Sequence, residues 1–142
     1  MKDSRVGIWT NPTTHSTGTT TNTGPTIDLF VSGVSEGGTE DGTGLFGIGA
    51  EILQTLSTGT AQVTVWSWEV SADNVTWRSG PFIGRGVMDA SQWDDIARLK
   101  TTLRTRNRYA RLLASNTGVG TSTSKCYAED MGGLYPESVA LA

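Results

Sequence analysis

This sequence has very few of the residues from which enzyme and metal sites are usually built. Its 142 residues include one cysteine, Cys126, and one histidine, His15. A single cysteine excludes an internal disulfide, and neither a C-x-x-C pair nor a His/Cys cluster is present to hold zinc. His15 lies in a threonine-rich stretch with no nucleophile or orienting acid beside it, so we do not expect it to act in catalysis. We expect a protein without enzymatic activity, metal or other cofactor.

Long apolar runs and a strong charge of one sign are also missing. No run approaches the roughly 18 residues of a membrane-spanning helix, and the N-terminus has no apolar segment typical of a signal peptide. Charged residues make up 18% of the chain, and the formal net charge is −3. Because proteins that track phosphates carry a basic stripe, this mild acidity argues against nucleic acid as a partner. We therefore expect a soluble protein, made in the cytoplasm, that binds neither nucleic acid nor membranes.

Acidic pairs and glycine-rich loops give no site either. The carboxylates at residues 40–41, 94–95 and 129–130 are adjacent, and adjacent side chains on a strand or loop usually face apart. Residues 73–74 offer oxygen atoms suited to calcium but lack the spacing of a calcium-binding loop. Residues 44–49 are rich in glycine but lack the lysine of a phosphate-binding loop.

Glycine and short β-prone runs are abundant in this chain. With 18 glycines among 142 residues, turn signals separate the apolar runs, as in an all-β domain. The run at residues 45–56 suits either a buried strand or a short helix, and we interpret it as a strand. The fold class that follows is an all-β, antiparallel β-sandwich or jelly roll of about eight short strands with an extended N-terminal arm. The expected strands are residues 26–31, 45–56, 60–71, 75–77, 81–87, 96–103, 108–114 and 121–128, with one helical turn within 89–95.

The composition divides the chain into three parts. Residues 1–25 are predicted to be an extended or disordered arm, residues 26–130 the sandwich domain, and residues 131–142 a tail. The arm consists largely of Thr, Ser, Asn, Gly and Pro, which bury too little apolar surface to offset the entropy of ordering. An apolar anchor near its start indicates that the arm becomes ordered against a neighbouring subunit. The anchor residues are Val6, Ile8 and Trp9.

Three of the five tryptophans, Trp66, Trp68 and Trp77, lie on a predicted hairpin with its turn at residues 71–74. Within residues 60–71 the apolar positions change parity, which indicates a bulge or a strand covered on both faces. Buried tryptophans would fill the core or a subunit interface, whereas exposed ones could stack on sugar rings. We favour the core and interface.

Most of the positive charge lies between residues 98 and 111. On strands, Arg98, Lys100, Arg108 and Arg111 would form a basic face that can pair with the carboxylates of a neighbouring subunit. A solvated face is the alternative.

The strand predicted at residues 108–114 carries a specific expectation. Tyr109 and Arg111 share a parity, so we expect them on one face, with Tyr109 partly buried beside the core hairpin and Arg111 paired to a carboxylate. Leu112 should face the opposite layer.

Three stretches resemble a known family in their order and sequence. They are "IDL" at residues 27–29, "VSADNVTW" at 70–77 and "NRYARLL" at 107–113. In this order they resemble the jelly-roll capsid cement, or decoration, proteins of tailed bacteriophages. The N-terminal arm and the C-terminal tail depart from that pattern, which leaves the contact surfaces open.

The resemblance implies a homo-dimer or homo-trimer on the outer surface of the virion. There it would bind the major capsid protein and bridge neighbouring capsomers. A carbohydrate-binding module on a virion or cell surface is the alternative, because aromatic residues on a sandwich can stack on sugars. A hydrolase is a third hypothesis, for which one histidine and one cysteine supply no site.

Overall fold

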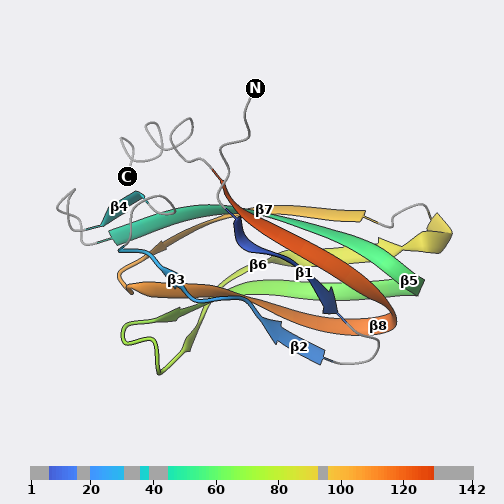
Figure 1. Cartoon of the computed structure of the whole chain (residues 1–142), viewed down its shortest axis with the longest axis horizontal. Coiled ribbons are helices and arrows are strands. Elements are labelled where there is room, and N and C mark those ends of the chain that lie inside the picture. The colour runs from blue at the N-terminus through green and yellow to red at the C-terminus, as the bar shows by residue number, and fades with distance from the viewer. Residues whose placement is uncertain (1–6, 16–19, 31–35, 39–44, 93–95, 130–142) are drawn as a thin grey trace.

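The computed structural model describes residues 7–15, 20–30, 36–38, 45–92 and 96–129. These residues are almost entirely antiparallel β-strand (Figure 1). None of the helices in this part of the chain is long and apolar enough to cross a membrane. The strands are β1 (Gly7–His15), β2 (Thr20–Thr23), β3 (Ile27–Asp28), β4 (Glu36–Gly38), β5 (Leu45–Ser71), β6 (Arg78–Asp89), β7 (Ile96–Thr105) and β8 (Tyr109–Glu129), and the predicted helical turn is η2 (Ala90–Gln92).

Two long strands organise the fold. β5 has 27 residues and β8 has 21, and they pair antiparallel along nearly their whole length. Both fold back at the same end of the molecule, so each contributes one half to either layer (Figure 1). The sheet has eight strands, which is the predicted number but not the predicted set, because β1, β2 and β4 were not predicted and the two long strands are not short. Predicted strands 45–56 and 60–71 are the two halves of β5, and predicted strands 108–114 and 121–128 are the two halves of β8.

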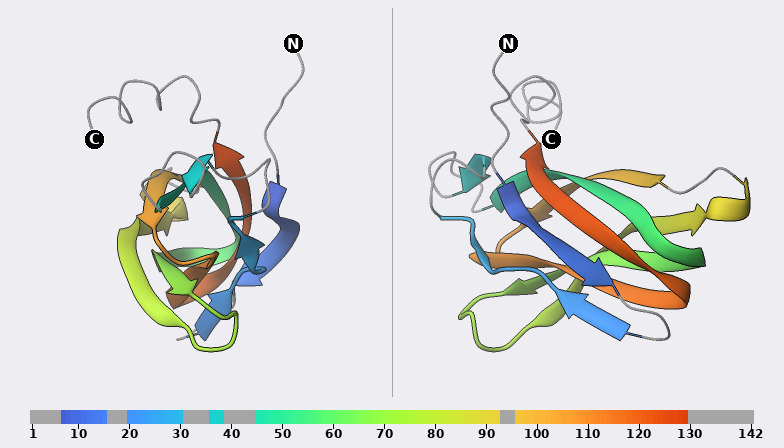
Figure 2. Two further views of the ribbon diagram at one scale, coloured as in Figure 1. Left: turned by 90° about the vertical axis from the view of Figure 1, so that its left-hand side faces the viewer. Right: turned by 45° about the vertical axis from the view of Figure 1, so that its right-hand side comes forward.

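The two layers form a β-sandwich with jelly-roll pairing. One layer contains β7, the first half of β5, the second half of β8 and β1. The other contains β6, the second half of β5, the first half of β8, and β2 with β3. The short β4 pairs with the start of β5. Apart from it, β1 pairs with the second half of β8, β2 and β3 with the first half of β8, the first half of β5 with β7, and the second half of β5 with β6. This nested order is that of a jelly roll. Figure 2 shows the layers facing each other.

Glycines allow the long strands to bend. Gly59, Gly118 and Gly120 have φ values of 84°, 132° and 153°, which disfavour any residue with a Cβ atom. A Cβ on Gly120 would also lie 2.4 Å from the carbonyl oxygen of Thr58 on the facing strand. The bend therefore depends on glycine at these positions.

Alternation along the strands places the core between the layers. Trp66, Trp68 and Leu112 from one layer meet Ile48 and Ile52 from the other, and all five are at most 1% exposed. Together they join the two faces into one hydrophobic cluster.

The apolar pattern of residues 60–71 predicted a bulge or a strand covered on both faces. The pairing of β5 with β6 does have register shifts between Trp66 and Ser67 and between Ser67 and Glu69, but the inward parity of β5 does not change there. The even-numbered positions face inward throughout, because Gln62 and Thr64 are buried in line with Trp66 and Trp68. Val65, on the outward parity, is 36% exposed. The apolar pattern was misleading because two inward positions are polar.

The prediction that residues 1–25 form an arm outside the sandwich is wrong for the residues that the structure describes. β1 pairs with the second half of β8, and β2 pairs with its first half. Ile8 and Trp9 are 8% and 7% exposed, and His15 is fully buried. Pairing with β8 satisfies the backbone, which is why a segment poor in apolar residues is still part of the domain. Val6 and the tail at 131–142 lie outside the described residues.

Candidate functional site

The three stretches that carry the family resemblance come together at one end of the sandwich. Asp28 of β3 lies opposite Tyr109 on one side of β8, and Ser71 of β5 lies opposite Tyr109 on the other. This end lies away from the bend of β5 and β8 (Figure 1). We call it the motif end and define it as residues 27–30, 69–78 and 107–111.

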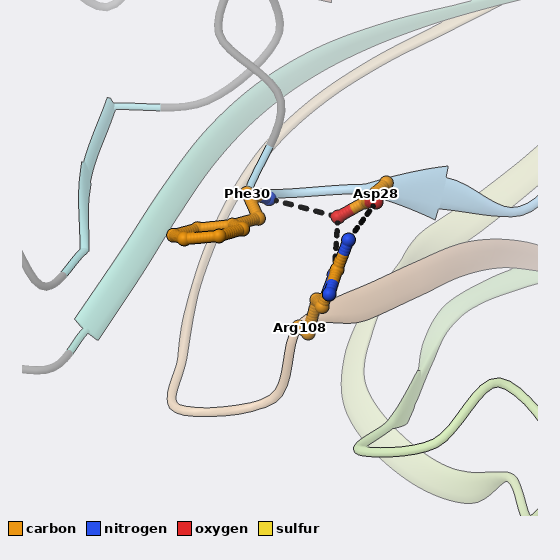
Figure 3. Close-up of polar contacts among 3 residues, drawn as sticks. All are labelled: Asp28, Phe30 and Arg108. Carbon is orange, nitrogen blue, oxygen red and sulfur yellow. Dashed lines mark hydrogen bonds and ion pairs between the residues drawn. The ribbon is translucent and has the colours of Figure 1, made fainter.

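A bidentate ion pair joins the first and third stretches. Arg108 Nε and Nη2 donate to the two carboxylate oxygens of Asp28 at 2.9 and 2.8 Å (Figure 3). The backbone N–H of Phe30 donates to Asp28 Oδ1 at 3.0 Å. These hydrogen bonds, with that from Arg108 the strongest, lower the pKa of Asp28, and Asp28 in turn raises the pKa of Arg108. The pair orders side chains that would otherwise move freely at the surface.

Aromatic rings flank the same guanidinium group. The ring centroids of Phe30 and Tyr109 each lie 5.2 Å from Arg108 Cζ. Phe30 is 60% exposed, although the edge of its ring meets Phe46. The motif end therefore presents an arginine and an exposed aromatic ring in a fixed arrangement.

A second arginine is held in the same manner. Arg111 Nε donates to Glu69 Oε1 at 2.7 Å, and the guanidinium lies 4.1 Å from the centroid of the Trp77 ring. The expected carboxylate partner of Arg111 is thus confirmed, but it belongs to the same chain. Tyr109 and Arg111 share the outward parity and are partly buried, and Leu112 is buried on the opposite face, as predicted.

The second stretch forms the turn between β5 and β6. The carboxylate of Asp73 accepts the backbone N–H groups of Val75 and Thr76, both at 2.9 Å, and these bonds lower the pKa of Asp73. Asn74 adopts a φ of 62°, a conformation that asparagine tolerates in turns. The turn is longer than expected, since residues 75–77 precede β6 instead of forming part of a strand.

Polar contacts tie this turn to both neighbouring stretches. Thr26 Oγ1 donates to Asn74 Oδ1 at 3.2 Å, and Arg78 Nη2 donates to Asn107 Oδ1 at 3.3 Å. The motif end is therefore one connected surface, although its parts are far apart in the sequence.

The predicted basic face is divided between the two layers. Arg98 and Lys100 are exposed on β7, whereas Arg108 and Arg111 lie at the start of β8 in the other layer. Arg98 Nε is 3.7 Å from Glu51 Oε2, and Glu51 is also the register partner of Lys100. The prediction of a single basic face is therefore wrong, because strand pairing separates these residues and supplies carboxylates from within the chain.

The tryptophans of the predicted core hairpin differ in their surroundings. Trp66 and Trp68 are fully buried, which confirms their place in the core and excludes them from stacking on a sugar. Their indole N–H groups donate to Gln54 Oε1 at 3.1 Å and Thr101 Oγ1 at 3.2 Å. Trp77 is only partly buried, beneath Arg111.

The side chains of the described residues do not meet the requirements of a metal site or of a reactive thiol. Among them, no three His, Cys, Asp or Glu side chains are grouped so that they could hold a metal ion. Burial raises the pKa of the Cys126 thiol to about 12, so this thiol is protonated at neutral pH. No protein-family model matches the chain, and no curated protein matches it.

Sequence reasoning missed two contributors to the motif end, Phe30 and Glu69. The sequence did contain a signal for Glu69. Glu69 is adjacent to the inward-facing Trp68, and Arg111 is adjacent to the inward-facing Leu112, so both charged side chains face outward. Opposite charges on the outer faces of neighbouring strands are expected to pair. Phe30 follows the short strand β3 and had no comparable signal.

Proposed function

We propose that this chain is a non-enzymatic structural protein of a virion, a cement or decoration protein on the outer capsid surface of a tailed bacteriophage. The observation that carries the proposal is that the three stretches resembling that family form one connected surface, the motif end. The jelly-roll sandwich supports it at the level of fold. Its partners are the major capsid protein and further copies of itself, as a homo-dimer or homo-trimer.

Such a protein acts by mass action. Binding only to the mature arrangement of the shell lowers the free energy of that arrangement. An oligomer that contacts neighbouring capsomers adds weak contacts through multivalency. Catalysis, nucleic acid and membranes have no part in this function.

The motif end has the chemistry of a protein contact. Arginine and aromatic residues are enriched among the residues that dominate binding energy at interfaces. Arg108 is held by Asp28, and Arg111 is held by Glu69, before any partner binds. Because these side chains are already ordered, less conformational entropy is lost on association.

Co-sedimentation with purified phage shells that lack the protein tests this proposal. We expect the wild-type chain to bind saturably, and we expect Phe30→Ala to weaken binding by about tenfold or more, as for a central interface residue. Val119→Ala is the matched control, since Val119 is 64% exposed at the opposite, bent end. The control should bind like the wild type. Absence of wild-type binding to every shell tried would overturn the proposal.

A carbohydrate-binding module is the second candidate, and one observation favours it. Phe30 is an exposed ring beside an ordered Asp28–Arg108 pair, and sugars stack on such rings. A glycan array separates the two candidates. Binding to a glycan that Phe30→Ala abolishes, without any binding to shells, would establish the second candidate in place of the first.

A further inference from the structure

A cluster of polar side chains lies inside the sandwich where the N-terminal strands meet β5 and β8. Its members are joined by hydrogen bonds, and all except Asn22 are buried. We call this cluster the polar core. Its members are His15 (β1), Asn22 (β2), Gln54, Gln62 and Thr64 (β5), and Asn116, Ser122 and Ser124 (β8).

The direction of these hydrogen bonds is fixed by Trp66. Its indole N–H can only donate, and it donates to Gln54 Oε1 at 3.1 Å. The amide nitrogen of Gln54 therefore donates to Thr64 Oγ1 and to Ser122 Oγ, both at 2.8 Å. Ser122 in turn donates to Gln62.

The same series of hydrogen bonds determines which ring nitrogen of His15 carries a proton. Thr64 donates to Asn116 Oδ1 at 2.8 Å, and Asn116 Nδ2 donates to Asn22 Oδ1 at 2.9 Å. His15 Nδ1 lies 3.0 Å from this acceptor oxygen and so carries the proton. Nε2 of the neutral ring is then left to accept the hydroxyl proton of Ser124, at 2.7 Å. The polar core thus holds His15 in one neutral tautomer.

Each described element that contacts the His15 ring presents an uncharged side chain to it. The His15 ring meets Trp9 of β1 and Trp66 of β5 edge to face, at centroid distances of 6.2 and 5.7 Å. β2 contributes Asn22, and β8 contributes Ser124.

Two titratable groups on β8 lie close in register to these contacts. Lys125 follows Ser124 but is exposed on the opposite face of the strand, and Cys126, opposite Trp9, is neutral. Within the described part of the chain, none of the side chains that contact the His15 ring is a carboxylate or a cation. Burial lowers the pKa of His15, and this effect outweighs the opposing hydrogen bond to Asn22.

We propose that His15 is an acid-sensitive latch, which holds β1 and β2 on β8 at neutral pH and releases them in mildly acidic solution. Protonation of Nε2 removes the acceptor for the Ser124 hydroxyl and places a charge on a buried ring that no described carboxylate contacts. Among the described residues, β1 and β2 each pair only with β8, so they can open without separating β8 from β5. The latch does not depend on which partner the protein binds.

The sign of the pH effect follows from proton linkage. The folded state binds a proton at His15 less readily than the unfolded chain, in which the pKa is about 6.5. The stabilisation is therefore complete above that value and is lost as the pH falls below it, toward the folded pKa. Each unit of difference between the two pKa values corresponds to a tenfold change in the equilibrium between closed and open states.

NMR on the full-length protein between about pH 7.5 and 5.0 tests the latch. His15 is the only histidine, so its ring resonances report the titration without ambiguity. We expect a titration midpoint below about 6.5. We also expect the protection factors of the amides in β1 and β2, measured relative to the intrinsic exchange rate at each pH, to fall as the pH is lowered. Amides in the second half of β5 should remain protected.

A matched variant separates the charge from the hydrogen bonds. His15→Gln cannot become charged, so we expect its urea midpoint to change less between pH 7.5 and 5.5 than that of the wild type, whatever its stability at neutral pH. If this variant does not fold, the NMR titration of the wild-type protein still tests the latch. The latch would be overturned by a wild-type His15 titration midpoint at or above about 6.5. It would also be overturned if the amides of β5 lost protection at acid pH together with those of β1.

Discussion

At the scale of single residues, the two fully buried tryptophans each lie where the polar atom of the ring finds a partner. Trp66 and Trp68 are fully buried, and each indole N–H donates to a side-chain oxygen. A buried donor without a partner would cost free energy that the ring's burial would have to offset. The polar residues Gln54 and Thr101 are therefore part of what allows tryptophan in this core.

Replacing Trp68 with Ala should lower the free energy of unfolding by about 3–5 kcal/mol, because the side chain leaves a cavity in a packed core. Urea denaturation measures the change. Phe82→Ala is the control, since Phe82 is 64% exposed and its loss should change stability by no more than about 0.5 kcal/mol. Equal losses in both variants would contradict the assignment of Trp68 to the core. Trp77, which is only partly buried, should fall between them.

At the scale of elements, the bent strands β5 and β8 decide the architecture. Each passes from one layer to the other without an intervening loop, and their pairing continues across the bend with register shifts between Leu56 and Thr58 and between Gly59 and Ala61. Bulges of this kind bend a strand and increase its twist. The bend therefore makes two facing layers from one continuous pair of strands.

Replacing Gly120 with Ala tests the bend. The new Cβ would lie 2.4 Å from the Thr58 carbonyl, and φ at this position is 153°. We expect a loss of at least about 1–3 kcal/mol, as for other strained backbone positions. Thermal unfolding monitored by circular dichroism measures it, with the exposed neighbour Thr60→Ala as control. If both variants melt at the same temperature, the backbone at this bend tolerates a side chain and our account of it is wrong.

At the scale of the whole molecule, the N-terminal strands complete the sandwich. β1 and β2 cover the side of β8 that β5 leaves open, and they bring Trp9 and His15 into the interior. An arm that becomes ordered only on a neighbour would instead leave the domain intact when it is removed. Removing the N-terminal residues should therefore destabilise the domain if they complete the sandwich, and should leave its stability unchanged if they form an arm.

Deleting residues 1–25 should therefore destabilise the remaining chain by more than the roughly 3–5 kcal/mol expected for one large aromatic side chain. Since domains are stable by only about 5–15 kcal/mol, the truncated chain should be largely unfolded or molten. Near-ultraviolet circular dichroism and urea unfolding report this. Trp9→Ala provides a folded comparison that should lose part of the same stability. A truncated chain with the wild-type urea midpoint would restore the interpretation of these residues as an arm.

The sequence by itself determined the features that depend on neighbours along the chain. Alternation at residues 96–103 and 108–114 predicted strands with the observed inward and outward faces, because side chains on a strand alternate whatever it pairs with. Residues 71–74 predicted the turn after β5, because Asp and Asn satisfy the backbone locally. The all-β class followed from the repetition of such runs and turns.

Tertiary structure alone decided the features that depend on distant partners. Residues 7–15 are a strand because β8, more than a hundred residues away, offers an edge to pair with. Arg108 and Arg111 have carboxylate partners because separate strands place Asp28 and Glu69 beside them. Gln62 and Thr64 can be buried because other strands complete their hydrogen bonds. The composition of a segment indicates how much apolar surface that segment can bury by itself. The free energy of burying its backbone and polar side chains depends instead on which hydrogen-bonding and charged groups the fold places opposite them.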